Sequence, residues 1–523
     1  MLKKLLLVTL LFSGYSNAQC DSVQVPGSWI VSTDDLLSGT YVVAGDFIVQ
    51  PGVTIYVKSF ANNGCGAFKV YANNIQMDGT INGDYSGFSG GTGGASASAI
   101  TSTSGHSTAL TACTGSSDAG DLAIEGGLAG LPGVGLGGGL AGMNGSGGSG
   151  SKQTCGNFGD GAGVVGGSGG AGGGAGGSYG GAGSNGANGG NASITVTVDD
   201  VTINTNVPTI GGNGGTGGAS AGTYGTAAGF DISLGSGGAG AGGGGRATNV
   251  GTQGAKGGAG GGLVFLKATS NLSVTGNITV KGENGLNGGN GGNGDDSPSC
   301  CSDGCDGCDE KTYSTGAGAG SGAGGGSGGG IYLETSTNAN ITGQLFAGGG
   351  NGGNSGAKGS GVTCVYTNTF CTDNSVTTGD GTVGNKGGAG GGGRIKIFVP
   401  DCALATVTPI NNYNAGTGNG SAGIGSYEYV CGYATLEENI FSNIQISPNP
   451  FNESIRIRLN DQLVDAGNQI DLKIMDAMGR VVYNESLNPQ LEVVISLGDL
   501  KNGYYFVQLS TTQNSFTTKL IKQ

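Results

Sequence analysis

The sequence predicts an all-β protein: a glycine-rich, right-handed parallel β-helix-like solenoid with polyglycine II excursions, followed by a small C-terminal β-sandwich. Glycine supplies 121 of the 523 residues. Short β-branched segments recur with glycine or asparagine after them, which is the composition that the strands and corners of stacked units require. Beyond residue 443 the glycine tracts stop and apolar and polar residues alternate, the period of half-buried strands.

The first residues have the composition of a signal peptide. Met1 to Lys4 form a positive n-region, and Leu5 to Phe12 an apolar stretch too short to cross a bilayer. Ser16 to Ala18 offer a small-residue cleavage site. Cys20 raises the alternative of a lipoprotein, but Gln19 directly before it fits a lipobox poorly. No other run is long and apolar enough to predict a membrane helix.

Charge and cysteine content restrict the function. Lys and Arg total 21 against 35 Asp and Glu, a formal net charge of −14. No Lys or Arg occurs between Lys69 and Lys152, so no basic stripe could neutralise phosphates, and nucleic acid is not expected as a partner. All 12 cysteines precede residue 440, and their even number suits disulfides formed on an extracellular route.

An internal repeat organises the region before residue 434. In each copy a glycine run precedes a strand, a short polar step and a second strand. The copies begin at Ala67, Ser193, Leu263, Ile331 and Ile395. The first gap is nearly twice as long as the others and could contain an eroded copy, and the fifth copy lacks a clear second strand, as a terminal cap would. Further strands at 38–43 and 47–57 precede the repeat, so we expect stacked rungs that bury a core only together.

Long glycine-rich excursions separate the strand pairs, and Gly166 to Gly174 is typical. One interpretation is a flexible linker. The other is a bundle of left-handed, threefold polyglycine II helices, in which glycine at two of every three positions lets neighbouring backbones pair. Ordering glycine costs ~0.5–1 kcal/mol more than alanine, and interhelix hydrogen bonds of ~1 kcal/mol each could offset that cost. Because Ala, Asn and Ser fill the remaining positions, we expect the bundle, whose composition resembles some phage tail-tip adhesins and one class of glycine-rich antifreeze protein.

An acidic, cysteine-rich stretch at residues 295–310 holds the densest cluster of chemical groups. Calcium is one interpretation, because that ion prefers oxygen ligands such as Asp303, Asp306 and Asp309, although the spacing lacks a full calcium-loop pattern. The C-x-x-C spacing alone would suggest zinc, but in an exported chain we expect these thiols to form disulfides. No other cofactor is expected. The disulfide candidates are Cys300, Cys301, Cys305 and Cys308, and, from proximity in sequence, the pairs Cys364 with Cys371 and Cys402 with Cys431.

Few residues suggest catalysis. His106 is the only histidine, which excludes multi-histidine metal centres and leaves little room for a histidine-based triad. Polysaccharide lyases and hydrolases that use a β-helix need clustered acidic and basic groups on one face. Asp78, Asp84 and Asp199-Asp200 flank turns, where aspartate is favoured for its geometry, and no basic residue accompanies them. A polysaccharide-degrading enzyme is therefore the alternative, and no enzymatic activity is the expectation.

A structural or adhesive role suits a long, weakly charged surface. Aromatic side chains could stack on extracellular glycans or contact cell surfaces. The candidates for this role are Tyr85, Phe88, Tyr179 and Tyr224. Ice binding is a further alternative, because threonines alternate in short runs, although they form no regular two-dimensional array. These threonines are Thr195, Thr197, Thr202 and Thr205.

The C-terminal residues carry four motifs in a fixed order: P-N-P, D-x-x-G-R-x-V, L-x-x-G-x-Y and a terminal K-L-I-K. Their residues are Pro448, Asn449, Pro450, Asp476, Gly479, Arg480, Leu500, Gly503, Tyr505, Lys519, Leu520 and Ile521. This tail resembles the type A C-terminal sorting domain of the Bacteroidota type IX secretion system. The resemblance implies that these residues form a sorting signal, that the outer-membrane secretion machinery recognises it, and that it is often removed.

These observations predict a signal peptide at residues 1–18, a glycine-rich repeat solenoid at 19–433, a linker at 434–443 and a sorting domain at 444–523. We expect a secreted or cell-surface structural or adhesive protein that does not span a membrane. The expected partners are the type IX machinery and, at its destination, extracellular glycans or cell surfaces.

Overall fold

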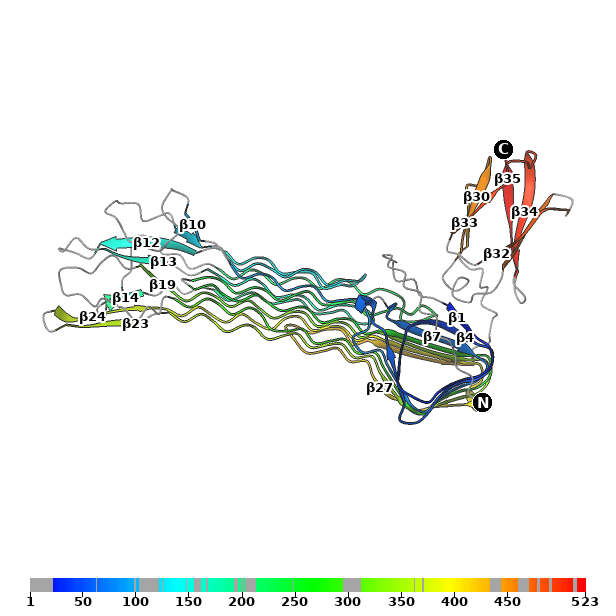
Figure 1. Ribbon diagram of the computed structural model, residues 1–523, viewed down its shortest axis with the longest axis horizontal. Helices are drawn as coiled ribbons and strands as arrows, with labels where there is room; N and C mark the ends of the chain where they lie inside the picture. Colours follow the sequence, from blue (N-terminus) through cyan, green and yellow to red (C-terminus); the bar gives the residue numbers. More distant parts are fainter. Residues whose placement is uncertain are drawn as a thin grey trace, which may run out of the picture.

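The computed structural model describes a β-solenoid, a glycine-rich bundle and a C-terminal sandwich (Figure 1). Backbone and side chains are described for residues 22–62, 64–97, 126–146, 168–191, 213–247, 249–294, 315–361, 378–432, 444–459, 470–476, 480–488, 492–510 and 516–523, with Ala61 as backbone only. The backbone alone is described for residues 100–102, 122–124, 148–154, 161–165, 196–198, 201–202, 312–314, 363–368, 371–377 and 515. Within these residues no helix is long and apolar enough to cross a membrane.

Three parallel sheets enclose the solenoid core in the described part of the chain. Sheet A consists, in spatial order, of β1 (Ser22–Val25), β4 (Gly39–Val43), β7 (Ala67–Ala72), β16 (Leu263–Ala268), β20 (Gly330–Thr335), β25 (Arg394–Val399) and β28 (Ser426–Cys431). Sheet B consists of β2 (Trp29–Val31), β5 (Phe47–Val49), β8 (Ile75–Met77), β17 (Leu272–Val274), β21 (Ala339–Ile341) and β26 (Ala405–Val407). Sheet C consists of β3 (Asp35–Leu37), β6 (Thr54–Val57), β9 (Thr80–Asn82), β18 (Asn277–Thr279), β22 (Gln344–Phe346) and β27 (Ile410–Asn412).

Six rungs each contribute one strand to each sheet, and β28 adds a seventh strand to sheet A alone. Alternate residues of the rung strands face a shared apolar core. In β25, for example, Ile395, Ile397 and Val399 belong to that core. Identical faces stack from rung to rung because the parallel register keeps equivalent residues opposite each other: Val264 pairs with Phe68 on one side and Ile331 on the other. Two 3₁₀ turns, η1 (Phe60–Asn62) and η2 (Cys402–Leu404), lie beside the rungs.

Two details of the predicted repeat are wrong. The segment from Ser193 does not form a rung, because β7 pairs directly with β16, and β14 (Val196–Val198) instead pairs antiparallel with β15 (Val201–Thr202). The copy from Ile395 is a complete rung, since β26 and β27 follow β25. Alternation of β-branched residues predicted the strands, but it does not distinguish a solenoid rung from a hairpin.

The glycine tracts form the predicted bundle of threefold helices. Along one buried tract, the N–H groups of Ala317, Gly318 and Ala319 donate to three different neighbouring tracts. The Gly320 N–H donates again to the tract that accepts from Ala317. Acceptors in that first tract step by three residues, at Gly292, Gly289, Leu286 and Glu283. A partner that recurs every third residue is what the threefold polyglycine II helix requires.

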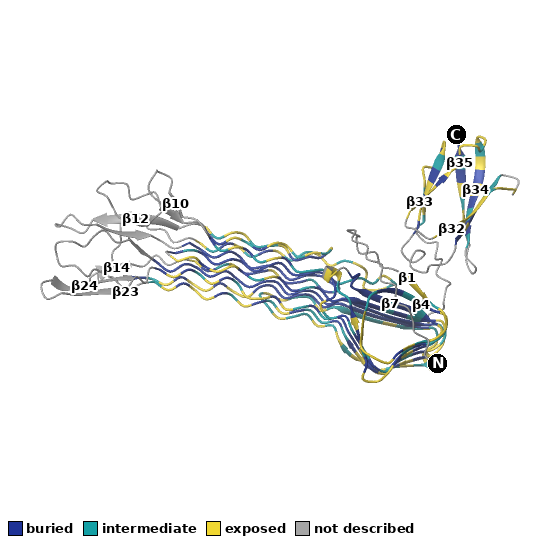
Figure 2. Ribbon diagram, viewed as in Figure 1, coloured by how far each residue is buried: buried dark blue, intermediate teal, exposed yellow. Residues whose placement is uncertain are grey.

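Inner tracts of this bundle are buried and outer ones exposed (Figure 2). Their remaining positions are small residues that are fully buried, such as Ala171, Ala239, Ala323 and Ser321. Glycine is needed where backbones touch: a Cβ on Gly324 would lie 1.9 Å from the Ala175 carbonyl oxygen. The bundle is therefore packed as closely as a conventional core, but by backbone rather than by large side chains.

Short strands gather at the end of the bundle away from the solenoid (Figure 1). We call this region the tip. One tip sheet contains β10 (Ile100–Ser102), β11 (Leu122–Ile124), β12 (Gly148–Thr154), β13 (Gly161–Val165) and β19 (Thr312–Ser314). The other contains β15, β14, β24 (Cys371–Thr378) and β23 (Thr363–Asn368).

Residues after Asn443 form an antiparallel sandwich of two sheets. One contains β29 (Gln445–Ser447), β30 (Ser454–Arg458) and β33 (Glu492–Ser496), and the other β32 (Val481–Leu487), β31 (Ile470–Asp476), β34 (Gly503–Ser510) and β35 (Ser515–Lys522). Alternate apolar residues of both sheets, among them Ile457, Ile474 and Val507, are fully buried between them. This is the small C-terminal sandwich that the sequence predicted.

Candidate functional site

The first and last tail motifs meet in the sandwich. Asn449 donates from Nδ2 to the Lys519 carbonyl at 2.9 Å and accepts at Oδ1 from the Ile521 N–H at 3.0 Å. Pro448 and Pro450 flank it, each after a cis peptide bond. The side chain of Leu520, between these two partners, is fully buried. A single amide side chain therefore joins the P-N-P motif to the end of the chain.

The second motif closes a turn between β31 and β32. The Arg480 N–H donates to Asp476 Oδ1 at 3.0 Å, and the Arg480 guanidinium lies 2.7 Å from Asp476 Oδ2. Gly479 lies outside the described residues. In the third motif, the Tyr505 hydroxyl donates to the Lys501 carbonyl at 2.7 Å, while Leu500 packs against the sandwich core. Gly503 begins β34.

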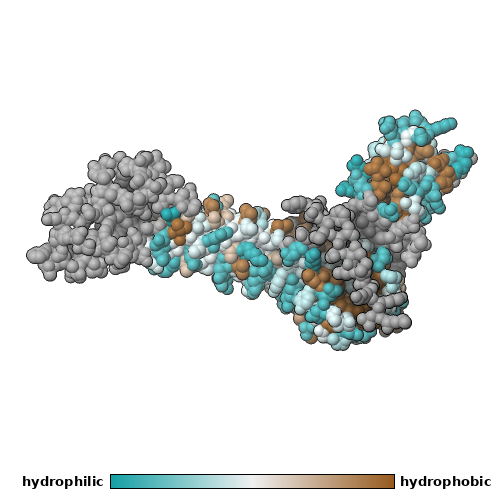
Figure 3. All heavy atoms as spheres, in the orientation of Figure 1, coloured by the Kyte–Doolittle hydropathy of each residue, from teal (hydrophilic) through white to brown (hydrophobic). Residues whose placement is uncertain are grey.

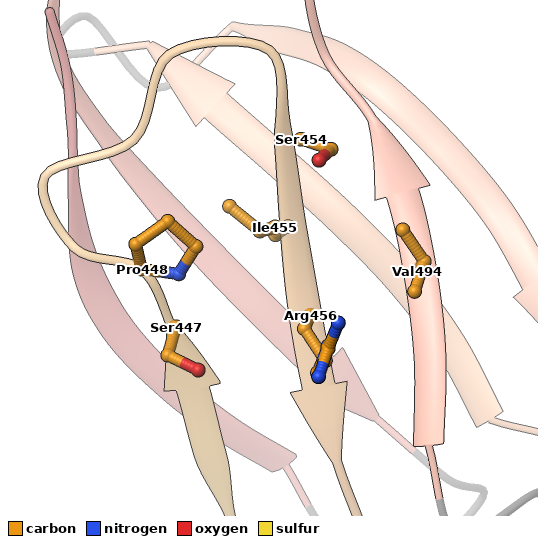
Figure 4. A pocket seen from close by; sticks show the side chains of 6 residues that line it. All are labelled: Ser447, Pro448, Ser454, Ile455, Arg456 and Val494. Carbon is orange, nitrogen blue, oxygen red and sulfur yellow. The ribbon is translucent and has the colours of Figure 1, made fainter.

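A shallow pocket lies beside the P-N-P motif (Figure 4). It is lined by Ser447, Pro448, Ser454, Ile455, Arg456 and Val494. Arg456 is held across the sheet by Glu492, with Nε 3.1 Å from Oε1. The pocket therefore combines a cation, hydroxyls and apolar carbon next to the sorting motif.

The predicted cysteine and calcium sites are described only in part. Cys402 and Cys431 form a disulfide with their Cα atoms 5.0 Å apart, as their proximity suggested. Cys364 and Cys371 lie on tip strands whose backbone alone is described. The other candidate disulfide, calcium and catalytic residues lie outside the described residues. They are Cys300, Cys301, Cys305, Cys308, Asp303, Asp306, Asp309 and His106. Among the described residues no group of three His, Cys, Asp or Glu could hold a metal ion.

The aspartates considered for catalysis bridge neighbouring rungs. Asp78 accepts from Thr275 Oγ1 at 2.5 Å and from Gln76 Nε2 at 2.6 Å. Asp84 accepts from Thr279 Oγ1 and from the Lys281 N–H. The bonds from Thr275, Thr279 and Lys281 join this rung to the next one, a structural role for both carboxylates. Lys281 Nζ also lies 4.0 Å from Asp84 Oδ2, so the expectation that no basic residue accompanies these aspartates is wrong for Asp84. Asp199 and Asp200 lie outside the described residues.

Of the aromatic residues considered for ligand stacking, Tyr85 is exposed, and Phe88 and Tyr224 are half-buried. Tyr179, in contrast, is 1% exposed and packs against Tyr224, with ring centroids 4.9 Å apart and the ring planes tilted by 37°. The prediction that Tyr179 presents a binding surface is therefore wrong. Of the threonines considered for ice binding, Thr197 lies opposite Thr202 in the β14–β15 pair, and Thr195 and Thr205 lie outside the described residues.

The outer bundle carries a row of exposed apolar side chains that the sequence reasoning missed. Leu128, Leu131 and Val134 recur every third residue and are 44%, 60% and 46% exposed. Leu140 and Met143 follow with the same spacing. Apolar residues are visible along the bundle surface in Figure 3. Threefold symmetry explains the row, because every third residue of such a helix points the same way.

A buried ionic cluster lies on the outer face of sheet A, beneath residues 222–234, which we call the strap. Since the odd residues of β25 face the core, Arg394, Lys396 and Phe398 face outward, yet they are only 3%, 0% and 2% exposed. Lys396 Nζ donates to the Gly229 carbonyl at 2.8 Å, the Asp231 carbonyl at 2.6 Å and Asp231 Oδ1 at 2.9 Å.

The remaining groups of this cluster bind the strap as well. Arg394 Nη2 donates to the Tyr224 carbonyl at 3.0 Å, and its guanidinium lies 5.4 Å from the centre of the Tyr179 ring. Glu428, opposite Lys396 on β28, accepts from the Gly229 N–H at 3.3 Å through Oε1. Its Oε2 is buried and has no hydrogen-bond partner among the described atoms. No sequence motif pointed to this cluster.

Burial and hydrogen bonding shift several pKa values here. Burial raises the pKa of Tyr224 to about 12 against opposing effects of Ser236 and Arg394, and it raises the pKa of Tyr179 as well. Partial burial acts to raise the pKa of Asp231, but hydrogen bonds from Thr226 and Lys396 outweigh it, so that this pKa lies below its usual value.

Comparison with known proteins identifies the family of the C-terminal residues. Residues 445–523 match the family described as secretion system C-terminal sorting domain. No curated protein matches the chain. A crystal structure of a DUF3244 family protein with an immunoglobulin-like β-sandwich fold, from Bacteroides vulgatus, matches over 15% of this chain and 83% of its own. At 17% identity and a TM-score of 0.13, that likeness carries no argument about function.

Proposed function

Because residues 445–523 form a type IX secretion C-terminal sorting domain, which directs the chain to the outer surface or the extracellular space, we propose that the region before it acts there as an adhesive spike. In this proposal the solenoid is the base, the polyglycine II bundle is the shaft, and the tip contacts glycans of a cell surface or matrix. The sorting domain engages the secretion machinery through the joined P-N-P and K-L-I-K motifs.

The observation that carries the proposal is the shaft. Its tracts are hydrogen-bonded to one another in three directions, which resists bending, and they hold the tip strands away from the solenoid. A rigid spacer with short polar strands at its end suits contact with a distant surface. An enclosed catalytic pocket would not need such a spacer.

The composition of the tip strands supports a glycan as the ligand. β19 reads Thr-Tyr-Ser, and β23 and β24 are rich in Thr, Asn and Ser with one tyrosine, Tyr366. Hydroxyl and amide groups can both donate to and accept from sugar hydroxyls, and tyrosine rings stack on the apolar faces of sugars. Within the described tip strands only Lys152 and Asp373 are charged, so contact through these strands should depend little on salt.

The test is retention of the exported, full-length protein on insoluble polysaccharides and on whole cells, with released sugar assayed in parallel. We expect retention without sugar release, and we expect the tip variants Tyr313→Ala and Tyr366→Ala to weaken it roughly tenfold, or ~1.4 kcal/mol. Tyr56→Ala is the matched control, because Tyr56 is a 45%-exposed tyrosine on the solenoid.

Three outcomes would overturn the proposal. Sugar release would indicate a polysaccharide-degrading enzyme. An equal loss on Tyr56→Ala would place the contact on the solenoid and not the tip. If no glycan or cell type retains the protein, a self-associating structural role is the remaining interpretation.

A further inference from the structure

We propose that Lys396 and Asp231 react with each other to form an intramolecular isopeptide bond that fixes the strap to the outer face of sheet A. The two groups are already in contact, with Nζ 2.9 Å from Oδ1. They come from residues 165 positions apart in the chain, so the bond would close a large covalent loop that includes shaft tracts and solenoid rungs.

The amine is held in place for this reaction. Lys396 lies on a strand flanked on both sides within sheet A, and its side chain is fully buried. Hydrogen bonds to the carbonyl oxygens of Gly229 and Asp231 direct Nζ toward the Asp231 carboxyl group. Fixing two reactants at this separation replaces a bimolecular encounter, an advantage that reaches an effective molarity of ~10⁵ M or more in well-oriented cases.

Aromatic groups surround the pair. Tyr332 lies opposite Lys396 on β20, and its ring centroid is 5.3 Å from that of Phe398. Phe230 of the strap packs against Phe398, with ring centroids 4.8 Å apart and the ring planes tilted by 36°. These rings cover the lysine side chain and limit the access of bulk water to the reacting amine. For the bond to form, the amine must lose protons and the leaving oxygen must gain them.

Glu428 is placed to move the protons. It lies opposite Lys396 in the register of β25 and β28 and contacts the strap through the Gly229 N–H. Its second oxygen is buried and has no hydrogen-bond partner among the described atoms. In this proposal Glu428 relays a proton from the attacking amine to the leaving oxygen through one bridging water.

The step is balanced without an oxidant or a cofactor. The Lys396 Nζ–Asp231 Cγ bond forms, one Cγ–O bond breaks, and that oxygen leaves as water with two protons that came from the ammonium group. One cation and one anion disappear together, so net charge is unchanged. The Asp231 side chain is 45% exposed, which gives the water a path out.

Other ion pairs of the described chain lack this combination. Lys267 lies 3.0 Å from Glu334, but its side chain is 33% exposed, whereas that of Lys396 is fully buried. Lys358 and Asp380 are 2.8 Å apart and about half exposed. These two pairs serve as internal controls, since they should remain unlinked.

Peptide mapping of the full exported protein by mass spectrometry, after reduction and trypsin digestion, tests the proposal. We expect the peptides that contain Asp231 and Lys396 to be joined. The mass of the linked product should be lower by one water than the sum of the two peptide masses, and trypsin should not cleave after Lys396. Lys396→Met should abolish the linked peptide, Glu428→Gln should reduce its yield at least tenfold, and Lys267→Met should leave it unchanged. Recovery of the protein with Lys396 unlinked and cleaved by trypsin after unfolding would overturn the proposal.

Discussion

Individual glycines of the shaft matter because they have no side chain. In a threefold helix each residue faces one neighbour, so a side chain is tolerated on outward positions and excluded where two backbones meet. Asparagines at outward positions add side-chain hydrogen bonds to a neighbouring tract. Asn284 Oδ1 accepts from the Asn351 N–H at 2.7 Å, and Asn290 Oδ1 accepts from the Ala357 N–H at 2.8 Å. Composition predicted this bundle because two-thirds glycine with Ala, Ser and Asn satisfies both requirements.

Adding one methyl group inside the shaft should be costly. The Cβ of Gly324→Ala would overlap the Ala175 carbonyl, so we expect a loss of ~1–3 kcal/mol of stability through overpacking. Gly222→Ala is the matched control, because no atom lies within 4 Å of its added Cβ. Thermal unfolding of the two variants checks this; equal melting temperatures would contradict close packing at Gly324.

Tyr224 of the strap and Tyr179, which packs against it, should resist ionisation. Tyrosine ordinarily titrates near pH ~10, and burial raises the pKa of Tyr224 to about 12. A raised acid pKa means that the folded state holds its proton longer than the unfolded state, so this stability is present below pH ~10 and is lost as pH rises toward 12. Ultraviolet titration should show a late-ionising class that Tyr224→Phe diminishes; a single transition in the wild-type protein would contradict it.

At the scale of elements, sequence periodicity identified most strands but not their partners. The segments at Leu263 and Ile331 became rungs as predicted, whereas the one at Ser193 lies in a tip hairpin with the same β-branched character. Pairing depends on where each glycine tract turns back, and no local pattern encodes that. The strap cluster was missed for the same reason: Lys396 occupies an ordinary outward position, and only the fold brings residues 222–234 over it.

The stability of the solenoid should depend on the inward-facing residues of its rungs. Leu333 is fully buried between rungs, so Leu333→Ala should cost ~2–5 kcal/mol. Ile410→Ala, at a residue 61% exposed on the last strand of sheet C, should change stability by less than ~0.5 kcal/mol. Trp29, the only tryptophan, packs against Tyr41 and Phe47 in the solenoid, so its fluorescence during urea unfolding reports this region. Equal midpoints for the two variants would refute the stacked core.

At the scale of the whole molecule, the sorting domain contains a contact between segments 70 residues apart. The motifs were recognisable from sequence, but the hydrogen bonds of Asn449 to Lys519 and Ile521 were not, because nothing local links the two ends of the domain. Those bonds hold the last strand, and with it Leu520, in the sandwich core.

Asn449→Ala removes both bonds and should lower sorting-domain stability by about 1–2 kcal/mol. In a host with a type IX system, we expect a larger fraction of the variant to remain in the periplasm. The exposed Asn452→Ala is the control. Wild-type export of Asn449→Ala would show that the machinery does not need this contact.

The adhesive proposal depends above all on an ordered shaft, which amide hydrogen exchange of the exported protein tests most directly. Tracts 168–191, 235–247 and 315–329 have N–H groups bonded within the bundle, so we predict protection at least comparable to that of the solenoid strands. Exchange of these tracts as fast as that of an unfolded glycine-rich peptide would contradict a rigid polyglycine II shaft, and with it the presentation of the tip.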